Sequence, residues 1–187
     1  MSHPASLPSR SLYAAVEALP EGVVGEVVDG QLYVHPRPSA RHGVAATRVG
    51  ADLSGPFDRG RGGPGGWWIV VEPEVHFVRD VELCVPDVAG WRRRRLPELP
   101  DGHRFEAVPD WLLEVSSPST ASYDRETKMP CYAAFGVPHV WIADPGSRVL
   151  EVHELADGRY REIGRFEGDS PIRAVPFEAI EIEAPWA

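Results

Sequence analysis

The sequence predicts an α/β (α+β) fold, in which a mixed β-sheet core is flanked by helices and β-hairpins. Segments with apolar residues at helical spacing alternate with short runs rich in Val, Ile and aromatic residues, in the order helix, hairpin, helix, strands, helix, strands. With 187 residues, of which 43% are hydrophobic and 25% charged, the chain is long enough to bury a core. We therefore expect a single domain over residues 1–187, without internal repeats.

The first part of the chain predicts two helices and one hairpin. Residues 11–22 place their apolar side chains on one helical face and end at a Pro and a Gly. Residues 23–36 form two β-rich runs joined by Asp29-Gly30, the pair that a tight two-residue hairpin turn prefers. Residues 39–53 again show helical spacing, with Ser39 as the N-cap.

The middle of the chain predicts strands between two loops. The glycine-rich residues 58–66 indicate a mobile loop, and they lack the Lys-Ser/Thr ending of a phosphate-binding loop. The β-rich runs 67–78 and 81–91 are separated by a short polar turn, which predicts an antiparallel pair. Residues 92–110 show neither the 3.6-residue period of a helix nor the two-residue alternation of a strand, and we expect a long surface loop.

The last part of the chain predicts a strand at residues 110–115, a helix, a further strand and a second hairpin. The helix carries Pro130, which must kink or restart it, and ends at Gly136 as a C-cap. A strand at residues 139–144 follows, and the second hairpin turns at the Asp-Gly-Arg of residues 157–159. Residues 176–187 are expected to form a short extended or helical finish.

Composition narrows the class of protein. The net charge of −9 and pI near 5.2 weigh against a surface built for general adhesion to nucleic acid, although they leave room for a local basic groove. The excess negative charge belongs either to an acidic surface or to carboxylates that bind a divalent cation. Cys84 and Cys131 have no metal-binding spacing, and no apolar run is long enough to cross a membrane. We expect reduced core thiols and a cytoplasmic protein.

Two acids stand out because each follows or interrupts an apolar strand. Asp87 ends the run Leu-Cys-Val-Pro-Asp, and Glu114 lies inside Trp-Leu-Leu-Glu-Val. If the two strands are neighbours, both carboxylates can bind one Mg²⁺ ion, which prefers oxygen ligands and suits phosphodiester cleavage. Lys128 could then hold the attacking water and stabilise charge on the phosphate.

Strand alternation predicts how Glu114 is oriented. It shares one face of its strand with the residues two positions away on either side, Leu112 and Ser116. The neighbouring Trp111, Leu113 and Val115 take the other face.

Each of these residues also has a structural interpretation. Asp87 follows a proline and could end its strand with an Asx turn. Glu114 could pair with an arginine or with Lys128 itself. Lys128 could pair with Asp124 one helical turn earlier.

Several motifs together carry a family resemblance. The segments VPDV, EVSSPST and DRETKMPCYAAFGVPHVWIADP, with GEVVDGQLYVHP and RHGVAATRV before them, closely resemble the putative restriction endonuclease family of the PD-(D/E)XK nuclease superfamily. The resemblance covers about residues 20–155. It implies a restriction-endonuclease-like fold and a Mg²⁺-dependent, or Mn²⁺-dependent, endonuclease that hydrolyses phosphodiester bonds of DNA.

The resemblance also implies residue roles. Asp87 matches the Asp of the motif and Glu114 its second acid, and both would bind the metal. Ser116 stands where the superfamily pattern expects lysine, so the resemblance implies that Lys128, on the following helix, supplies it. Glu26 matches an acid of the first hairpin and would bind or orient a metal or its water; its alternative is an exposed hairpin face.

Other polar residues carry weaker predictions. We expect Glu72 to be structural and His42, at a helix start, to be a solvated or hydrogen-bonding residue. The run Arg92, Arg93, Arg94 and Arg95 is the best candidate for contact with DNA phosphates, with the solvated loop as its alternative. Trp91 beside it could stack on a base or pack under the loop.

Two other functions compete with the nuclease. The chain could be a binding or scaffold protein that keeps the nuclease fold and cleaves nothing, although the intact motif speaks against this. It could also be an acid-pair hydrolase of another substrate class, such as one acting on glycosidic bonds. A nuclease that cuts two strands would work as a homodimer, which is a further expectation.

Overall fold

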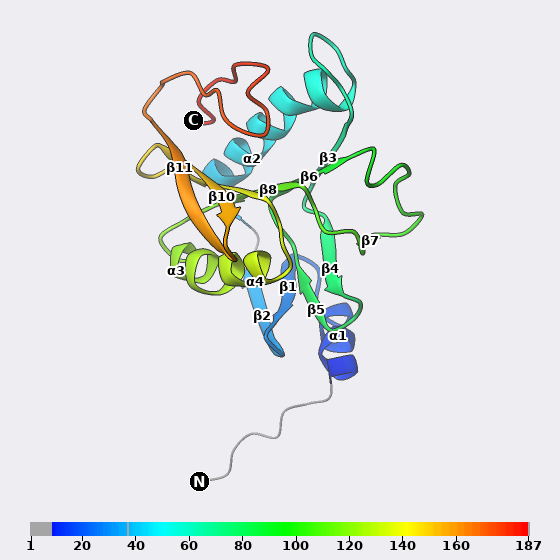
Figure 1. The fold of residues 1–187 in the computed structure, drawn as a ribbon. Helices are drawn as coiled ribbons and strands as arrows, with labels where there is room; N and C mark the ends of the chain where they lie inside the picture. Colours follow the sequence, from blue (N-terminus) through cyan, green and yellow to red (C-terminus); the bar gives the residue numbers. More distant parts are fainter. Residues whose placement is uncertain (1–8, 37, 187) are drawn as a thin grey trace.

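The computed structural model describes residues 9–36 and 38–186, and the chain forms two β-sheets rather than the one mixed sheet expected from the sequence (Figure 1). The five-stranded sheet has the order β2-β1-β5-β4-β7, with β1 (Val23–Val28), β2 (Gln31–Pro36), β4 (Glu74–Val78), β5 (Glu82–Cys84) and β7 (Arg104–Phe105). The six-stranded sheet has the order β11-β10-β9-β8-β6-β3, with β3 (Trp67–Val71), β6 (Val88–Arg92), β8 (Trp111–Val115), β9 (His139–Asp144), β10 (Val149–Ala156) and β11 (Arg159–Glu167). Both sheets are mixed, because β4 and β7 pair in parallel, as do β8 and β9. The α+β class is confirmed.

The two predicted hairpins are present, and their turns explain why. Asp29 and Gly30, between β1 and β2, have φ angles of 51° and 67°. Asp157 and Gly158, between β10 and β11, have φ angles of 52° and 75°. Two successive positive φ angles are what a two-residue turn requires to match the twist of its strands, and Asp-Gly tolerates them well.

The helices begin and end near the predicted positions. They are α1 (Ser9–Glu17), α2 (Ala40–Leu53), the π-helical turn η1 (Ser54–Asp58), and the consecutive α3 (Ala121–Tyr123), η2 (Asp124–Lys128) and α4 (Met129–Ala134). Ser39 caps α2, since its hydroxyl accepts the backbone N–H of His42 at 3.4 Å. Pro130 has no N–H to donate, and the wide π-helical turn η2 lies directly before it. Gly136, with φ of 77°, ends this helix.

Each long β-rich run of the middle segment is divided in two, which the sequence did not predict. The run 67–78 breaks at Glu72-Pro73, where Glu72 has φ of 48°, and the run 81–91 breaks at residues 85–87. The halves therefore enter different sheets: β4 pairs with β5 around the predicted turn, whereas β3 pairs with β6 in the six-stranded sheet. A proline at each break removes a backbone donor and favours this separation. The second break leaves Asp87 where the two sheets meet.

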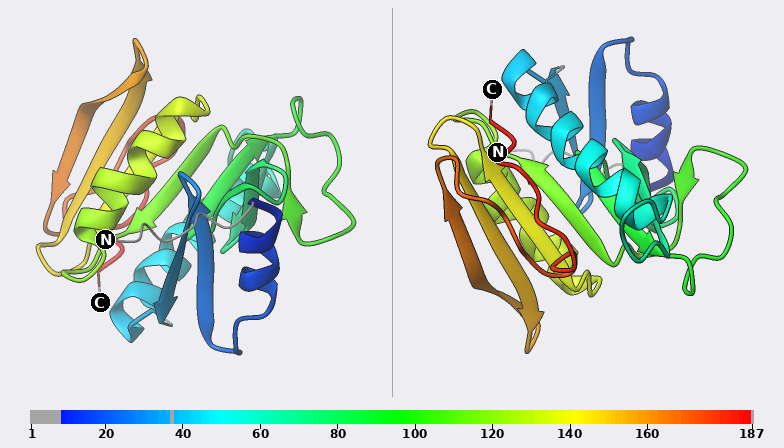
Figure 2. Two further views of the ribbon diagram at one scale, coloured as in Figure 1. Left: turned by 90° about the horizontal axis from the view of Figure 1, so that it is seen from below. Right: turned by 90° about the horizontal axis from the view of Figure 1, so that it is seen from above.

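The six-stranded sheet is covered on both faces. Helix α2 and the C-terminal segment lie on one side, and the α3–η2–α4 helix and the five-stranded sheet lie on the other (Figures 1 and 2). Trp111, Leu113 and Val115 of β8 belong to the first hydrophobic cluster, and Leu112 belongs to the second. The alternation predicted for this strand is confirmed.

The C-terminal segment, residues 168–186, contains no regular helix or strand among the described residues. Its only ladder contact in the described residues is an isolated antiparallel bridge between Ile172 and Ile182. Phe177 and Trp186 are 2% and 6% exposed and pack into the cluster that contains Trp111. This segment is therefore ordered by burial of its apolar side chains, which do not follow a regular period.

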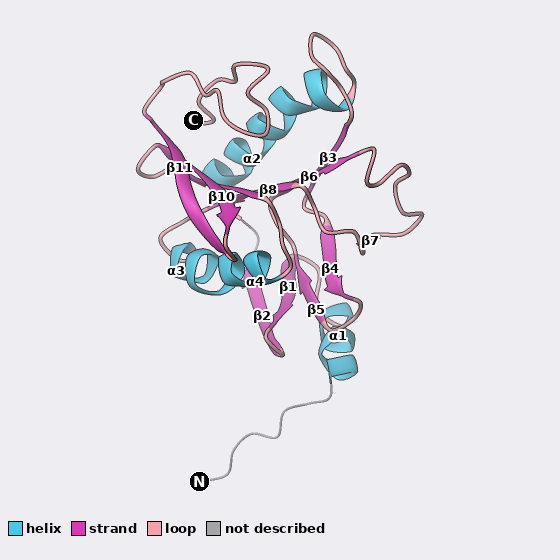
Figure 3. Cartoon of the chain, in the orientation of Figure 1, coloured by secondary structure: helices cyan, strands magenta, loops and turns pink. Residues whose placement is uncertain are grey.

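Most of the predicted surface loop is irregular (Figure 3), but it is not free of structure. It contributes β7, and Ala107 accepts the indole N–H of Trp91 at 2.7 Å. Trp91 is fully buried and stacks on Phe105, so it packs under the loop and does not serve as a base-stacking platform. The glycine-rich loop folds back on η1, with Gly65 donating its N–H to the Pro56 carbonyl at 2.9 Å.

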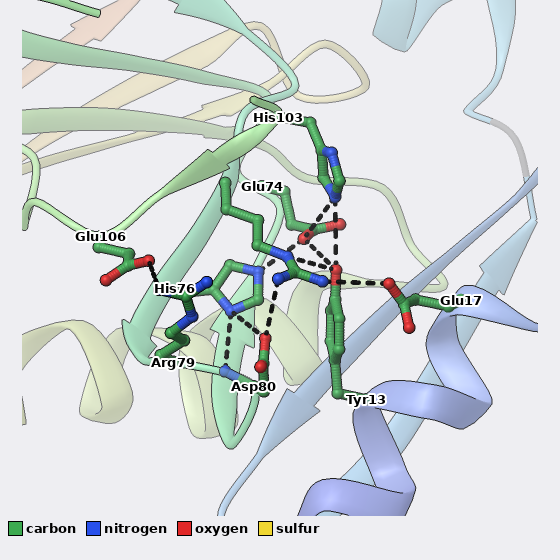
Figure 4. A network of polar contacts seen from close by, with 9 residues as sticks. Tyr13, Glu17, Glu74, His76, Arg79, Asp80, His103 and Glu106 are labelled. Carbon is green, nitrogen blue, oxygen red and sulfur yellow. Dashed lines mark hydrogen bonds and ion pairs between the residues drawn. The ribbon is translucent and has the colours of Figure 1, made fainter. Parts of the chain in front are cut away.

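A polar network ties α1 to the five-stranded sheet (Figure 4). The Tyr13 hydroxyl donates to Glu74 Oε1 at 2.9 Å and accepts from Arg104 Nε at 3.0 Å. His76 Nε2 lies 2.6 Å from the same Glu74 oxygen. Burial acts to raise the pKa of Glu74, but hydrogen bonds with His76 and Tyr13 and the nearby His103, 3.6 Å away, lower it.

Two further expectations concern the whole chain. Within the described ranges, no helix is both long and apolar enough to cross a membrane. Cys84 and Cys131 are buried and free, as predicted for core thiols.

Candidate active site

A pocket of about 560 Å³ lies where the two sheets meet. Its walls come from the first hairpin, the start of α2, the connection between β5 and β6, the end of β8, and the segment from the β8–α3 loop to η2. Four residues predicted from the sequence line it together: Glu26, Asp87, Glu114 and Lys128. Residues up to 102 positions apart in the chain thus share one pocket, which makes it the candidate active site.

Asp87 and Glu114 lie at neighbouring positions of the six-stranded sheet. Asp87 directly precedes β6, which pairs with β8 so that Val88 lies opposite Leu113. Asp87 Oδ2 accepts the backbone N–H of Val115 at 2.6 Å. The two acids therefore line the same pocket, as expected from the sequence, but Asp87 lies one residue before its strand and not within it.

Glu114 is the single acid of β8, and 3% of its surface is exposed. Lys128 Nζ lies 2.7 Å from its Oε1, and the Tyr132 hydroxyl donates to the same oxygen at 2.5 Å. Burial raises the pKa of Glu114 well above its usual value, and the nearby carboxylates of Asp87, Asp124 and Glu26 add to this, although Lys128 opposes it.

Lys128 is a buried ammonium shared by two acids. Its Nζ lies 3.1 Å from Glu26 Oε1 in addition to its contact with Glu114, and it donates to the Val85 carbonyl at 3.4 Å. Burial alone would lower the pKa of Lys128, but Glu114 and Glu26 raise it well above its ordinary value. The alternative pairing with Asp124 is not what the structure shows: Asp124 instead accepts a hydrogen bond from Ser116 Oγ at 2.9 Å.

Glu26 points into the site and not to solvent. It is 2% exposed, and its Oε1 accepts the backbone N–H of Val85 at 2.7 Å. His35 Nε2 lies 3.5 Å from its other oxygen. The contacts of Glu26 thus hold Lys128 and the β5–β6 connection, and the first hairpin brings it there as expected.

Two residues that contact the site acids were not predicted from the sequence. His42, interpreted as a helix-start residue, places Nε2 at 2.5 Å from Asp87 Oδ1. Tyr132 binds Glu114. A signal for Tyr132 was present, because Asp124, Lys128 and Tyr132 recur at every fourth residue on one helix face, and all three are buried. No spacing connects His42 with Asp87, which is 45 positions away.

The arginine run lies away from the pocket. Arg92 follows Asp87 by five residues of extended chain, about 16 Å, and none of the four arginines lines the pocket. Arg93 pairs with Asp58 at 2.5 Å, and Arg95 pairs with Asp110 at 2.8 Å. The DNA-contact role of Arg92 to Arg95 stays a prediction, now with structural roles beside it.

Glu72 also contributes to the pocket wall, beside its role at the strand break. Its side chain is exposed, and its backbone N–H donates to the Asp87 carbonyl at 3.0 Å. This bond connects the two chain breaks that separate the sheets, which agrees with the structural role expected for Glu72.

A second group of potential ligands lies outside the pocket. Among the described residues, Glu151, His153 and Glu162 form the one group of three whose ligand atoms all lie within 4.8 Å of one another. Glu151 is already bound by Arg125 at 2.7 Å and Arg165 at 2.9 Å. At the candidate active site, Lys128 lies between Glu26 and Glu114. These two carboxylates are therefore partly occupied by the ammonium, and an ion in the pocket would be held by few carboxylates.

Two mixed sheets with several acids and one lysine gathered in a pocket between them agree with a restriction-endonuclease-like protein. The family model Uma2, described as "Putative restriction endonuclease", matches residues 12–186, and the chain belongs to this family. Among solved structures, a putative nuclease belonging to DUF820 from Anabaena variabilis ATCC 29413 is similar, with a TM-score of 0.72 and 19% sequence identity over 92% of this chain and 94% of that chain. At this identity the likeness concerns the fold. Among curated proteins there is no match.

Proposed function

We propose that the protein is a Mg²⁺-dependent endonuclease that hydrolyses phosphodiester bonds of DNA. The observation that carries the proposal is the convergence of Asp87, Glu114 and Lys128 in one pocket, from the start of β6, from the adjacent strand β8 and from the helix that follows β8. The family is described as "Putative restriction endonuclease" and the similar solved structure as a "putative nuclease", and both descriptions support the same reaction class.

The donor set of the pocket fits a hard divalent cation. Asp87 and Glu114 offer carboxylate oxygens, and the backbone carbonyl beside Glu114 offers a further one. The described contacts of Glu114 all go to Oε1, which leaves Oε2 for a ligand. One or two carboxylates with waters and substrate phosphate is the usual coordination of Mg²⁺, and Mn²⁺ accepts the same ligands. When bound, such an ion supplies Lewis-acid stabilisation of the phosphate and activation of a water.

The remaining side chains have roles that follow from their contacts. Lys128 holds its ammonium at the acid cluster, where it can orient the attacking water and stabilise negative charge that develops on the phosphate. Glu26 fixes the position of Lys128, and it is also the third candidate metal ligand predicted from the sequence. Tyr132 fixes Glu114 Oε1 and is kept protonated, because burial and the neighbouring Glu114 raise its pKa.

Nicking of supercoiled plasmid DNA tests the proposal. We expect cleavage with Mg²⁺ or Mn²⁺ and none with chelator, and we expect losses of at least about 100-fold in Asp87→Asn, Glu114→Gln and Lys128→Ala. Glu154→Gln is the matched control, since Glu154 is an exposed acid of β10. Wild-type protein that cleaves with neither ion, or Asp87→Asn with wild-type rate, would overturn the proposal. Cleavage of an RNA duplex at the same rate would show that the enzyme does not require DNA.

A second candidate is a binding protein that keeps the fold without cleaving. The observation in its favour is that Lys128 already satisfies two buried acids, so the site is paired without a metal. The same plasmid assay separates the two candidates, together with a DNA-binding measurement: binding with no cleavage under any divalent ion supports the second. No feature of the described pocket residues favours a glycosidic substrate.

The proposal extends to assembly and location. We propose a homodimer, because two copies place two active sites on the two strands of a duplex. Free, buried Cys84 and Cys131 are consistent with the reducing cytoplasm as the place of action. Light scattering coupled to gel filtration tests the dimer, and a monomer that still cuts both strands at one position would refute it.

A further inference from the structure

Asp87 is held from two sides, although it lies outside any regular strand. Its Oδ2 accepts the N–H of Val115 at 2.6 Å, and its Oδ1 lies 2.5 Å from His42 Nε2. These contacts come from different elements, β8 and the first turn of α2. A carboxylate with only one anchor can rotate about that contact, whereas two anchors fix its plane.

The position of His42 is itself defined by the helix start. Ser39 caps α2 by accepting the His42 N–H at 3.4 Å. The backbone from which the His42 side chain extends is therefore fixed by the cap. The His42 and Asp87 side chains are 15% and 14% exposed, so both reach the pocket surface while their contact is partly shielded from water. The pocket lining includes both residues.

We propose that His42 is a positioning residue for Asp87: it donates Nε2–H to Oδ1 and holds the carboxylate in the orientation that binds a divalent cation. This rests on the proposed function. Each carboxylate oxygen accepts two hydrogen bonds or ligands, so both oxygens of Asp87 keep a lone pair for the ion.

The geometry favours positioning over direct ligation by His42. Two ligands of one octahedral ion, each about 2.1 Å from it and at right angles, are about 3.0 Å apart. His42 Nε2 and Asp87 Oδ1 are in direct contact at 2.5 Å, closer together than two such ligands would lie. Partners that orient a metal ligand in this way contribute about 10- to 100-fold to metal affinity.

Binding of Mn²⁺ alone, followed by the electron paramagnetic resonance signal of the free ion, tests the inference without any turnover. We expect His42→Ala to weaken Mn²⁺ binding about 10- to 100-fold. We expect His42→Gln to recover most of the affinity, since its amide can donate a hydrogen bond near the position of Nε2. Thr47→Ala, at an exposed position of the same helix, is the matched control and should bind as wild type does. Melting temperatures of all variants identify any that fail to fold. If His42→Ala does, His42→Phe, which keeps a ring but cannot donate a hydrogen bond, replaces it and should show the same weakened binding.

The outcomes separate this inference from the proposed function. Unchanged Mn²⁺ affinity in His42→Ala, with normal binding by the wild type, overturns the positioning role alone. Spin-echo modulation from a directly bound nitrogen that disappears in His42→Ala would show His42 to be a ligand and also overturns it. Wild-type protein that binds no Mn²⁺ refutes the proposed metal site and this inference with it.

Discussion

The replacement Lys128→Met removes the one ammonium that lies between two buried acids. Methionine keeps much of the length and apolar stem of lysine, so the change is mainly one of charge. Lys128 contacts Glu114 at 2.7 Å and Glu26 at 3.1 Å, and its side chain is 5% exposed. Both acids then lose their cation inside the protein.

The expected cost follows from this burial. Breaking a buried ion pair by removing one partner costs about 3–5 kcal/mol, because an uncompensated charge remains. For a chain of this size, each kcal/mol lowers the melting temperature by about 2–4 °C, so we expect a fall of about 6–20 °C.

The loss also depends on pH. Burial and the neighbouring acids raise the pKa of Glu114, and Lys128 opposes this rise, so the pKa of Glu114 is higher still in Lys128→Met. A raised pKa stabilises the fold fully below the unfolded pKa, and this stabilisation is lost as the pH rises through the folded pKa. The deficit of Lys128→Met should therefore shrink when the pH is lowered from 8 to 5.

Thermal unfolding by circular dichroism at pH 5 and pH 8, without divalent ions, measures both effects. The matched control is Arg161→Met, which breaks an ion pair with Asp157 whose side chains are 65% and 86% exposed, and which should cost less than about 1 kcal/mol. If Lys128→Met melts no lower than this control at pH 8, the ammonium is not a structural partner of the two acids. A deficit that grows at pH 5 would refute the assignment of the raised pKa to Glu114.

Three further outcomes are expected. Tyr132→Phe removes a hydrogen bond to Glu114 and should destabilise the protein by about 1.5–3 kcal/mol in urea unfolding; a change below about 0.5 kcal/mol would mean that the contact contributes little. Burial acts to raise the pKa of Glu151, but hydrogen bonds from Arg125 and other partners lower it to about 2, so its stabilisation is present above pH 4.5 and lost as the pH falls towards 2. Glu151→Gln should flatten the fall in stability between pH 5 and pH 2.5, and a curve parallel to the wild type would contradict this. Replacing Arg92 to Arg95 by Ala should reduce the slope of log DNA affinity against log salt concentration by up to about 0.9 per lost phosphate contact. An unchanged slope would mean that these arginines do not contact phosphates.

Local signals in the sequence determined the elements that depend on a few neighbouring residues. Asp29-Gly30 predicts its hairpin because the turn needs positive φ angles at two adjacent positions, and both are found. The alternation in β8 places Glu114 opposite Trp111 and Leu113, since successive side chains of a strand point to opposite faces. Together with the family resemblance, such signals also identified Asp87, Glu114 and Lys128 as candidates for one site.

Only the tertiary structure decided how these residues meet. Whether Lys128 pairs with Asp124 or with Glu114 and Glu26 depends on how the helix packs against two sheets, and helical spacing permits either. The contact of His42 with Asp87 joins a helix start to a strand break, and neither position carries a periodic signal for the other. The division of the β-rich runs between two sheets also carries no local signal, because strand pairing is determined by partners distant in the chain. Local propensity sets the conformation of a segment, whereas burial and long-range pairing determine which segments come together.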